Sequence, residues 1–163
     1  MATLLGMLGC VLTSGCSADR PLSAEVLDFG IYDVRLTGKG TKVESTLSGS
    51  VLDIEGDAKL VNQEITIPAV TGTSFGFRFI LKGDSNSTPP LITFEHTNPG
   101  ITPPGRPKGT SDAFQCRCPV GEIQRCVYTI NHDWEAEPGN WVLRILDGER
   151  LLAEKTFVLK KAL

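Results

Sequence analysis

The sequence predicts an all-β fold, a sandwich of two antiparallel sheets with about seven to eight strands. Apolar and polar residues alternate along several short segments, and such alternation places the apolar side chains on one face of a strand. Gly, Pro, Asn and Asp interrupt these segments, as turn residues do. No amphipathic helix of useful length is indicated. These three observations together favour strands and turns over any helical architecture.

The clearest strand spans residues 74–81. Phe75, Phe77, Phe79 and Leu81 alternate there with smaller or polar residues. Because alternate residues of a strand share a face, we expect these four large side chains in the core.

Weaker alternation predicts further strands. They span residues 26–34, 51–54, 59–67 and 91–96. A stop at Pro68 is expected for the third of them, because proline cannot donate to a sheet ladder.

The chain ends in a predicted β-hairpin. Trp141, Leu143 and Ile145 share one face, the pair Asp147-Gly148 forms the turn, and residues 151–159 return. Asp-Gly between apolar-rich segments is a strong hairpin signal. The number and spacing of all these strands are typical of an immunoglobulin-like sandwich.

Composition sets the broad class. A chain of 163 residues favours one domain. The net charge of −3 argues against nucleic acid as a partner, because phosphates call for a surplus of Lys and Arg. Only two His are present, which leaves little material for a multi-histidine metal centre.

The N-terminus has the character of a secretory signal. Residues 1–15 carry no charge and include a short apolar segment, too short to cross a bilayer permanently. The end of this segment, Leu12-Thr13-Ser14-Gly15-Cys16, resembles the lipobox of bacterial lipoproteins. That resemblance implies removal of residues 1–15, a lipid on Cys16, a tether over residues 16–24 and a domain over residues 25–163. Cys10 is a second candidate for the lipidated residue, and a buried N-terminal strand or helix is the alternative.

The lipoprotein class also implies a location. The residue after the lipidated cysteine is Ser17, and in Gram-negative lipoproteins a residue other than Asp there usually permits transfer to the outer membrane. We therefore expect a lipid-anchored protein that faces the periplasm, with the outer membrane favoured over the inner.

Two segments carry a family resemblance. One is Ile67-Pro68-Ala69 with Gly72-Thr73-Ser74-Phe75, and the other is Asp133-Trp134-Glu135 with Pro138-Gly139-Asn140-Trp141. Their order and spacing resemble a bacterial family known as domain of unknown function 3859, over roughly Leu27 to Lys160. The resemblance implies a single β-sandwich and supplies no catalytic residue. By themselves, the two Trp side chains are expected to pack at one end of the sandwich, and Asp133 and Glu135 to lie at a solvated edge.

The cysteines outside the N-terminal segment lie close together in the sequence. If residues 116–128 form a hairpin with its tip near Glu122, Cys118 and Cys126 face each other at a separation within disulfide range. We therefore predict a Cys118–Cys126 disulfide, which an oxidising periplasm would permit. Cys116 would be left over, with a diagonal pairing to Cys126 as a rival.

A metal site is the alternative use of these cysteines. Cys116, Cys118 and Cys126 could hold zinc or copper(I) together with His96 or His132, but their spacing does not match the paired pattern of structural zinc sites.

The leading functional prediction is a non-enzymatic module of the cell envelope that binds another envelope protein. No catalytic motif is present in the sequence, and no cofactor is expected. The Pro-rich segment 97–110 is predicted as a long irregular loop, and its residues Arg106 and Lys108 as partner contacts. The alternative is a periplasmic protein that binds a metal or small molecule at the cysteines; a hydrolase would need a polar cleft formed by folding.

Overall fold

The computed structural model describes residues 21–84 and 88–161, and within these ranges the chain forms nine strands and one short 3₁₀ helix. The predicted signal and the cysteines Cys10 and Cys16 lie outside the described residues. The elements are β1 (Ser23–Lys42), β2 (Ser50–Asn62), β3 (Thr66–Pro68), β4 (Ser74–Lys82), β5 (Leu91–Ile101), β6 (Gly109–Arg117), β7 (Ile123–Thr129), η1 (Asp133–Glu135), β8 (Gly139–Asp147) and β9 (Arg150–Lys160).

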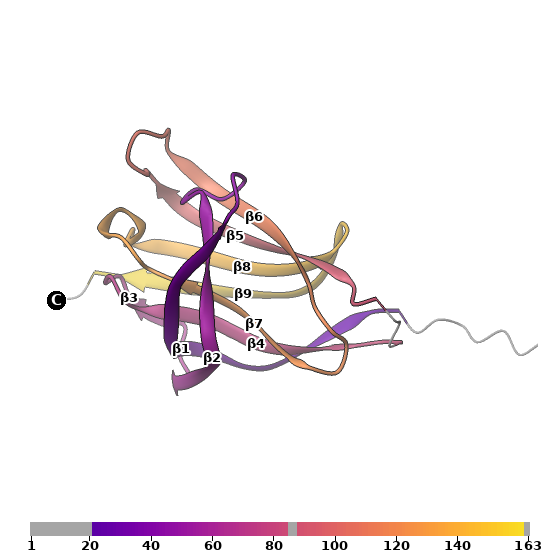
Figure 1. Cartoon of the computed structure of the whole chain (residues 1–163). Helices are drawn as coiled ribbons and strands as arrows, with labels where there is room; N and C mark the ends of the chain where they lie inside the picture. Colours follow the sequence, from indigo (N-terminus) through magenta and orange to yellow (C-terminus); the bar gives the residue numbers. More distant parts are fainter. Residues whose placement is uncertain (1–20, 85–87, 162–163) are drawn as a thin grey trace, which may run out of the picture.

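The strands form two facing sheets (Figure 1). One sheet has the order β2-β1-β4-β7 and the other the order β3-β9-β8-β5-β6. All pairings are antiparallel except that of β3 with β9. The predicted immunoglobulin-like sandwich is confirmed. Within the described ranges, no helix is long and apolar enough to span a bilayer.

The core lies between β4 and β8, as the alternation predicts. Phe75 contacts Trp141 edge-on, with ring centroids 5.9 Å apart. The predicted core positions of both strands are fully buried: Phe75, Phe77, Phe79, Leu81, Trp141, Leu143 and Ile145. The terminal hairpin is also confirmed, with Asp147 paired to Arg150 across the turn.

The hairpin of β1 and β2 is longer than predicted and leaves the sheet. β1 pairs with β4 only as far as Tyr32, and beyond that residue it pairs with β2 alone. Gly30 marks the start of this departure: its φ is +139°, and a Cβ there would lie 2.0 Å from the carbonyl oxygen of Asn62. A side chain would therefore prevent the close approach of β2.

The free half of this hairpin folds over the rest of the molecule, which Figure 1 shows as a steep crossing over the other strands. Arg125 of β7 donates to the backbone carbonyls of Ile54 and Gly56 in β2. At the tip, the Ser45 hydroxyl donates to the carbonyl of Ala113 in β6. Because β6 and β7 are edge strands of different sheets, the hairpin covers the side of the sandwich between them.

Two predictions about the middle of the chain are wrong. Half of residues 97–110 are strand, and the irregular part is limited to residues 102–108. Pro99 is accommodated because the β5–β6 ladder is irregular between Thr97 and Ile101, and an irregularity tolerates a missing N–H.

Residues 116–128 do not form a hairpin, since β6 and β7 belong to different sheets. The chain crosses between the sheets after Arg117, where Cys118 donates its N–H to Pro90 and Gly121 donates to Leu81. Cys126 therefore faces Phe77 of β4 in the ladder, not Cys118.

Candidate functional site

A cavity of about 180 Å³ lies beneath the β1–β2 hairpin. The hairpin supplies one wall, mostly aliphatic, and β5, β6, β7 and the segment around η1 supply the other. The lining residues are Leu36, Thr46, Ser48, Ser50, Val51, Leu52, Ile54, His96, Asp112, Phe114, Val127, Tyr128, Thr129, Asn131, His132 and Glu135. Thr46, His96 and Glu135 are also among the buried polar residues of the described chain, so polar side chains and apolar ones share this space.

His96 is the central polar group of the cavity. It lies on β5, its side chain is 9% exposed, and its Nδ1 is 3.4 Å from Oδ1 of Asp112 on β6. The two residues face each other across the β5–β6 ladder. Its Nε2 is buried and has no hydrogen-bond partner within the described residues. A buried polar atom without a partner is uncommon in native proteins and calls for an explanation.

Asp112 connects this histidine to the hairpin. Its Oδ2 accepts a hydrogen bond from the Leu47 N–H at 3.3 Å, while its Oδ1 is directed to His96. One carboxylate therefore lies beside the imidazole and also holds the hairpin tip against β6.

A second carboxylate, Glu135, is only 2% exposed, so its predicted place at a solvated edge is wrong. It accepts hydrogen bonds from the backbone N–H groups of Asn131 and His132 at 2.6 and 2.9 Å and from the Tyr128 hydroxyl at 3.1 Å. The bond to His132 closes the start of η1, because a glutamate at the third helical position reaches back to the first free N–H.

Tyr128 lies between the two carboxylates. Burial raises its pKa, and the charges of Glu135 and Asp112 raise that pKa further. Its ring contacts His96 edge-on at 5.5 Å and Trp141 at 4.9 Å. Tyr128 is therefore neutral at physiological pH and joins the cavity to the core.

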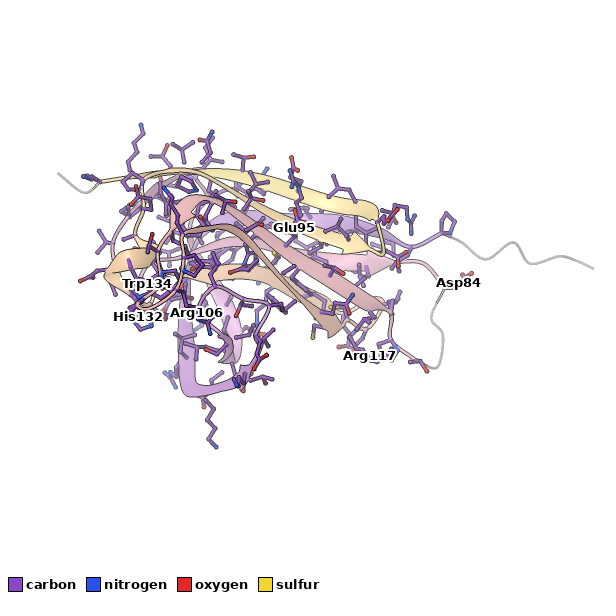
Figure 2. All side chains as sticks on the ribbon, turned by 90° about the horizontal axis from the view of Figure 1, so that it is seen from above. Asp84, Glu95, Arg106, Arg117, His132 and Trp134 are labelled. Carbon is purple, nitrogen blue, oxygen red and sulfur yellow. The ribbon has the colours of Figure 1, made fainter. Side chains whose placement is uncertain are left out.

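Aromatic side chains also mark the rim. His132 is exposed and stacks on Trp134 with ring centroids 5.3 Å apart. Figure 2 shows both residues, with Arg106, at the end of the molecule from which the hairpin projects. As the sequence predicts, Trp141 and the half-buried Trp134 pack on the core.

The predicted contact residues of the Pro-rich segment lie beside this site without lining it. Arg106 is exposed, and its guanidinium donates to the carbonyls of Thr46 and Leu47 at 3.4 and 3.3 Å. The stem of Lys108 lies against Gly100. Their contact with a partner stays a prediction, but Arg106 has a further role in securing the hairpin tip.

The cysteines lie elsewhere in the fold. Cys118 and Cys126 are buried in the core and Cys116 is exposed, and no disulfide joins any of the three in the described structure. Burial raises the pKa of Cys118 to about 12, with Cys116 beside it adding to the rise, and burial also raises the pKa of Cys126. The disulfide stays a prediction, although the hairpin geometry behind it is wrong.

No metal centre is formed by these residues. Among residues 21–84 and 88–161, no group of three or more His, Cys, Asp and Glu side chains is placed to hold a metal ion. His96 faces Asp112 and Tyr128, so the metal alternative that joins it to Cys116, Cys118 and Cys126 is wrong.

Sequence reasoning missed Asp112, Tyr128 and Glu135. The sequence suggests His96 only as a metal ligand, and His132 only as an alternative ligand for the same metal. These residues come from β5, β6, β7 and η1, and no short motif connects them.

Comparison with known proteins supports the fold. Residues 22–159 match the family described as a domain of unknown function (DUF3859). An immunoglobulin-like protein from Pseudomonas aeruginosa is similar in structure, with a TM-score of 0.65, 21% identity, and coverage of 88% of this chain and 99% of that one. An alkylpurine DNA glycosylase from Pseudomonas fluorescens, solved on DNA with an abasic site analogue, gives a TM-score of 0.36 at 16% identity, over 83% of this chain and 31% of that one. No curated protein matches the chain.

Proposed function

Because the chain belongs to the DUF3859 family, whose description assigns no activity, we propose from the site itself that the protein is a non-enzymatic binding module. The cavity beneath the β1–β2 hairpin receives a small ligand or one side chain of a partner. The observation that carries this proposal is the buried Nε2 of His96, which has no hydrogen-bond partner within the described residues and borders the cavity.

The energetic cost of that atom supports binding. An unsatisfied buried polar group costs about 1–3 kcal/mol, and Oδ1 of Asp112 also lacks a hydrogen bond within the described part of the chain. A ligand that hydrogen-bonds to Nε2 removes part of this cost. The aliphatic side chains of Leu36, Val51 and Ile54 add apolar contact on the opposite wall, which is the usual composition of a ligand site.

The same atom does not fit a hydrolase that uses a nucleophilic side chain. The cavity has a polar wall, as a hydrolase would require, and His96 with Asp112 resembles the base and orienting group of a catalytic triad. A nucleophilic mechanism also needs a hydroxyl or thiol hydrogen-bonded to the base. Within the described residues, nothing is hydrogen-bonded to Nε2.

The proposal includes attachment to the cell envelope through a lipid on Cys16, with another envelope protein as a partner. Two acyl chains anchor a protein stably at a membrane surface. Fractionation of cells tests this part. We expect the protein in the membrane fraction and the Cys16→Ser variant in the soluble fraction, and recovery of both in the same fraction would contradict the anchor.

A titration followed by NMR tests the binding proposal. The ¹⁵N-labelled protein is titrated with three matched four-carbon probes, n-butylammonium, 1-butanol and butyrate. We expect at least one probe to shift the ¹⁵N resonance of His96 Nε2 saturably, with other shifts confined to residues that line the cavity. If no probe does so, the cavity is not a binding site.

A further inference from the structure

The charges of the cavity are unbalanced. Asp112 and Glu135 both line it, with side-chain exposure of 7% for Asp112 and residue exposure of 2% for Glu135. The described lining residues include no Lys or Arg. Arg106 reaches the same hairpin tip, but its guanidinium donates to backbone carbonyls. Because buried carboxylates act through a medium of low dielectric constant, they create a negative potential in the cavity.

The orientation of His96 adds a hydrogen-bond acceptor. Its Nδ1 lies 3.4 Å from Oδ1 of Asp112, an ion-pair contact that is not a hydrogen bond in the described structure. The negative charge of the carboxylate still favours the tautomer of the neutral ring that carries the proton on Nδ1. In that tautomer Nε2 presents a lone pair, and this atom is the buried one without a partner within the described residues. The complementary ligand atom is therefore a hydrogen-bond donor.

Aromatic rings complete the surroundings of this acceptor. The His96 ring meets Phe114 and Tyr128 edge-on, with centroids 5.9 and 5.5 Å away, and both of those residues line the cavity. The cavity volume of about 180 Å³ is close to that of engineered cavities of roughly 150 Å³ that hold benzene, so only a compact group fits.

We propose that the cavity selects an alkylammonium group, whose nitrogen donates a hydrogen bond to Nε2 of His96 while its charge lies between Asp112 and Glu135. This inference rests on the binding function proposed above and adds the chemical class of the ligand. The group is carried either by a free primary amine or by a lysine side chain of a partner, since both present the same four-carbon ammonium.

The relative affinities of the three probes test this selection in the unmodified protein. We expect n-butylammonium to bind at least about tenfold more tightly than 1-butanol and butyrate to bind most weakly. Equal or tighter binding of 1-butanol or butyrate at Nε2 overturns the alkylammonium selection but leaves the binding function standing. If none of the three binds, both proposals fall.

An isosteric variant tests whether a carboxylate of the cavity causes the preference for an ammonium group. Glu135→Gln removes one charge without touching His96, and we expect it to weaken n-butylammonium about tenfold with little change for 1-butanol. Asp133→Asn is the matched control, because Asp133 is an exposed carboxylate of η1 that does not line the cavity. An equal loss for n-butylammonium and 1-butanol would show a structural effect and contradict the charge selection.

Blocked lysine, Nα-acetyl-lysine N-methylamide, distinguishes the two sources. Binding as tight as that of n-butylammonium supports a partner's lysine side chain, because the cavity then admits the attached backbone. Binding weaker by about tenfold or more supports a free amine. Both outcomes require that n-butylammonium binds more tightly than 1-butanol and butyrate. If it does not, the alkylammonium proposal is rejected.

Discussion

At the scale of single residues, Glu135 shows how one buried side chain supports a site. Its carboxylate accepts two backbone N–H groups and the Tyr128 hydroxyl, and hydrogen bonds to a charged group contribute more than neutral ones. We expect Glu135→Ala to lower the free energy of unfolding by roughly 2–4 kcal/mol, since it leaves three donors without their acceptor.

Urea unfolding measures this effect. The control is Glu137→Ala, two residues along the chain and exposed, for which we expect a change within about 0.5 kcal/mol. Similar losses in both variants would mean that the hydrogen bonds of Glu135 contribute little.

Asp28 contributes to the way the free energy of unfolding depends on pH in the acidic range. Its carboxylate accepts hydrogen bonds from Arg78 and from the Tyr32 hydroxyl, and the bond to Arg78 is the main reason that its pKa is lowered. A carboxyl whose pKa is lower in the folded state stabilises the protein above its unfolded pKa of about 3.9 and loses that contribution as pH falls through the folded value.

We expect Asp28→Asn to be less stable at pH 7 by about 1–2 kcal/mol and to lose less stability than the wild type between about pH 5 and pH 2. Thermal unfolding at a series of pH values checks this. Parallel pH profiles for the two proteins would contradict it. Tyr32 affects stability at alkaline pH, because its pKa is raised in the folded state. Its contribution to the free energy of unfolding is present below about pH 10, the pKa of an unfolded tyrosine, and is lost at higher pH.

The three described thiols differ in burial and therefore in their expected reactivity. Only Cys116 is exposed, and the pKa of Cys118 is raised to about 12 and that of Cys126 is raised as well. Since the thiolate is the reactive species, we expect Cys116 alone among these three to be alkylated in the native protein under reducing conditions. Mass mapping before and after denaturation checks the expectation, and native labelling of Cys126 would contradict it.

At the scale of elements, polar contacts help to hold the tip of the β1–β2 hairpin. Its tip is attached to β6 through the Leu47 N–H and Ser45, and Arg106 donates to two of its carbonyls. We expect Arg106→Ala to speed amide exchange at Leu47 about threefold. The effect is small because each of the two long hydrogen bonds that Arg106 donates contributes at most on the order of 1 kcal/mol to the stability of the hairpin tip.

Arg117→Ala is the matched control for this variant. Arg117 also donates its guanidinium to a backbone carbonyl, that of Pro89, but it lies at the other end of the molecule (Figure 2). We expect no change at Leu47. Equal acceleration in both variants would exclude a specific role of Arg106 at the hairpin tip.

Alternation predicted some elements and failed for others for one physical reason. In residues 74–81 and in the terminal hairpin, every second side chain is large, so the sequence predicts both the strand and its buried face. In the hairpin the turn signal lies between the two strands, so the sequence also predicts which strands pair. Residues 116–128 alternate too, but alternation does not decide between a hairpin and a crossing to the opposite sheet. The outer end of β1, from Thr37 to Lys42, is exposed and contains no apolar residue.

The site was less predictable than the fold. His96 and Asp112 meet because β5 pairs with β6, and Glu135 joins them because η1 follows β7. Each residue alone is compatible with an exposed loop or strand edge. Only the register of the β5–β6 ladder and the folded hairpin turn them into a buried cluster.

At the scale of the whole molecule, the start of β1 and the cavity lie far apart. β1 begins beside the end of β4, where Ser23 pairs with Lys82, and the ladder runs to Tyr32 paired with Ser74. The pocket residues Tyr128 and Thr129 pair with Phe75 and Ser74 at that second end. A strand rises about 3.3 Å per residue, so the start of β1 lies at one end of this sheet and the cavity at the other. If the proposed lipid is attached to Cys16, the membrane lies nearer to the start of β1 than to the cavity.

This arrangement predicts that the cavity faces away from the membrane. A fluorescent unnatural amino acid is introduced at His132, on the cavity rim, or at Arg117, at the opposite end (Figure 2), and the lipidated protein is placed in vesicles with a quencher on the lipid head groups. We expect stronger quenching at Arg117 than at His132, because quenching falls with distance from the membrane surface. With Cys16→Ser, quenching at both positions should vanish. Stronger quenching at His132 in the lipidated protein would mean that the cavity lies against the membrane, where a soluble envelope partner has no access to it.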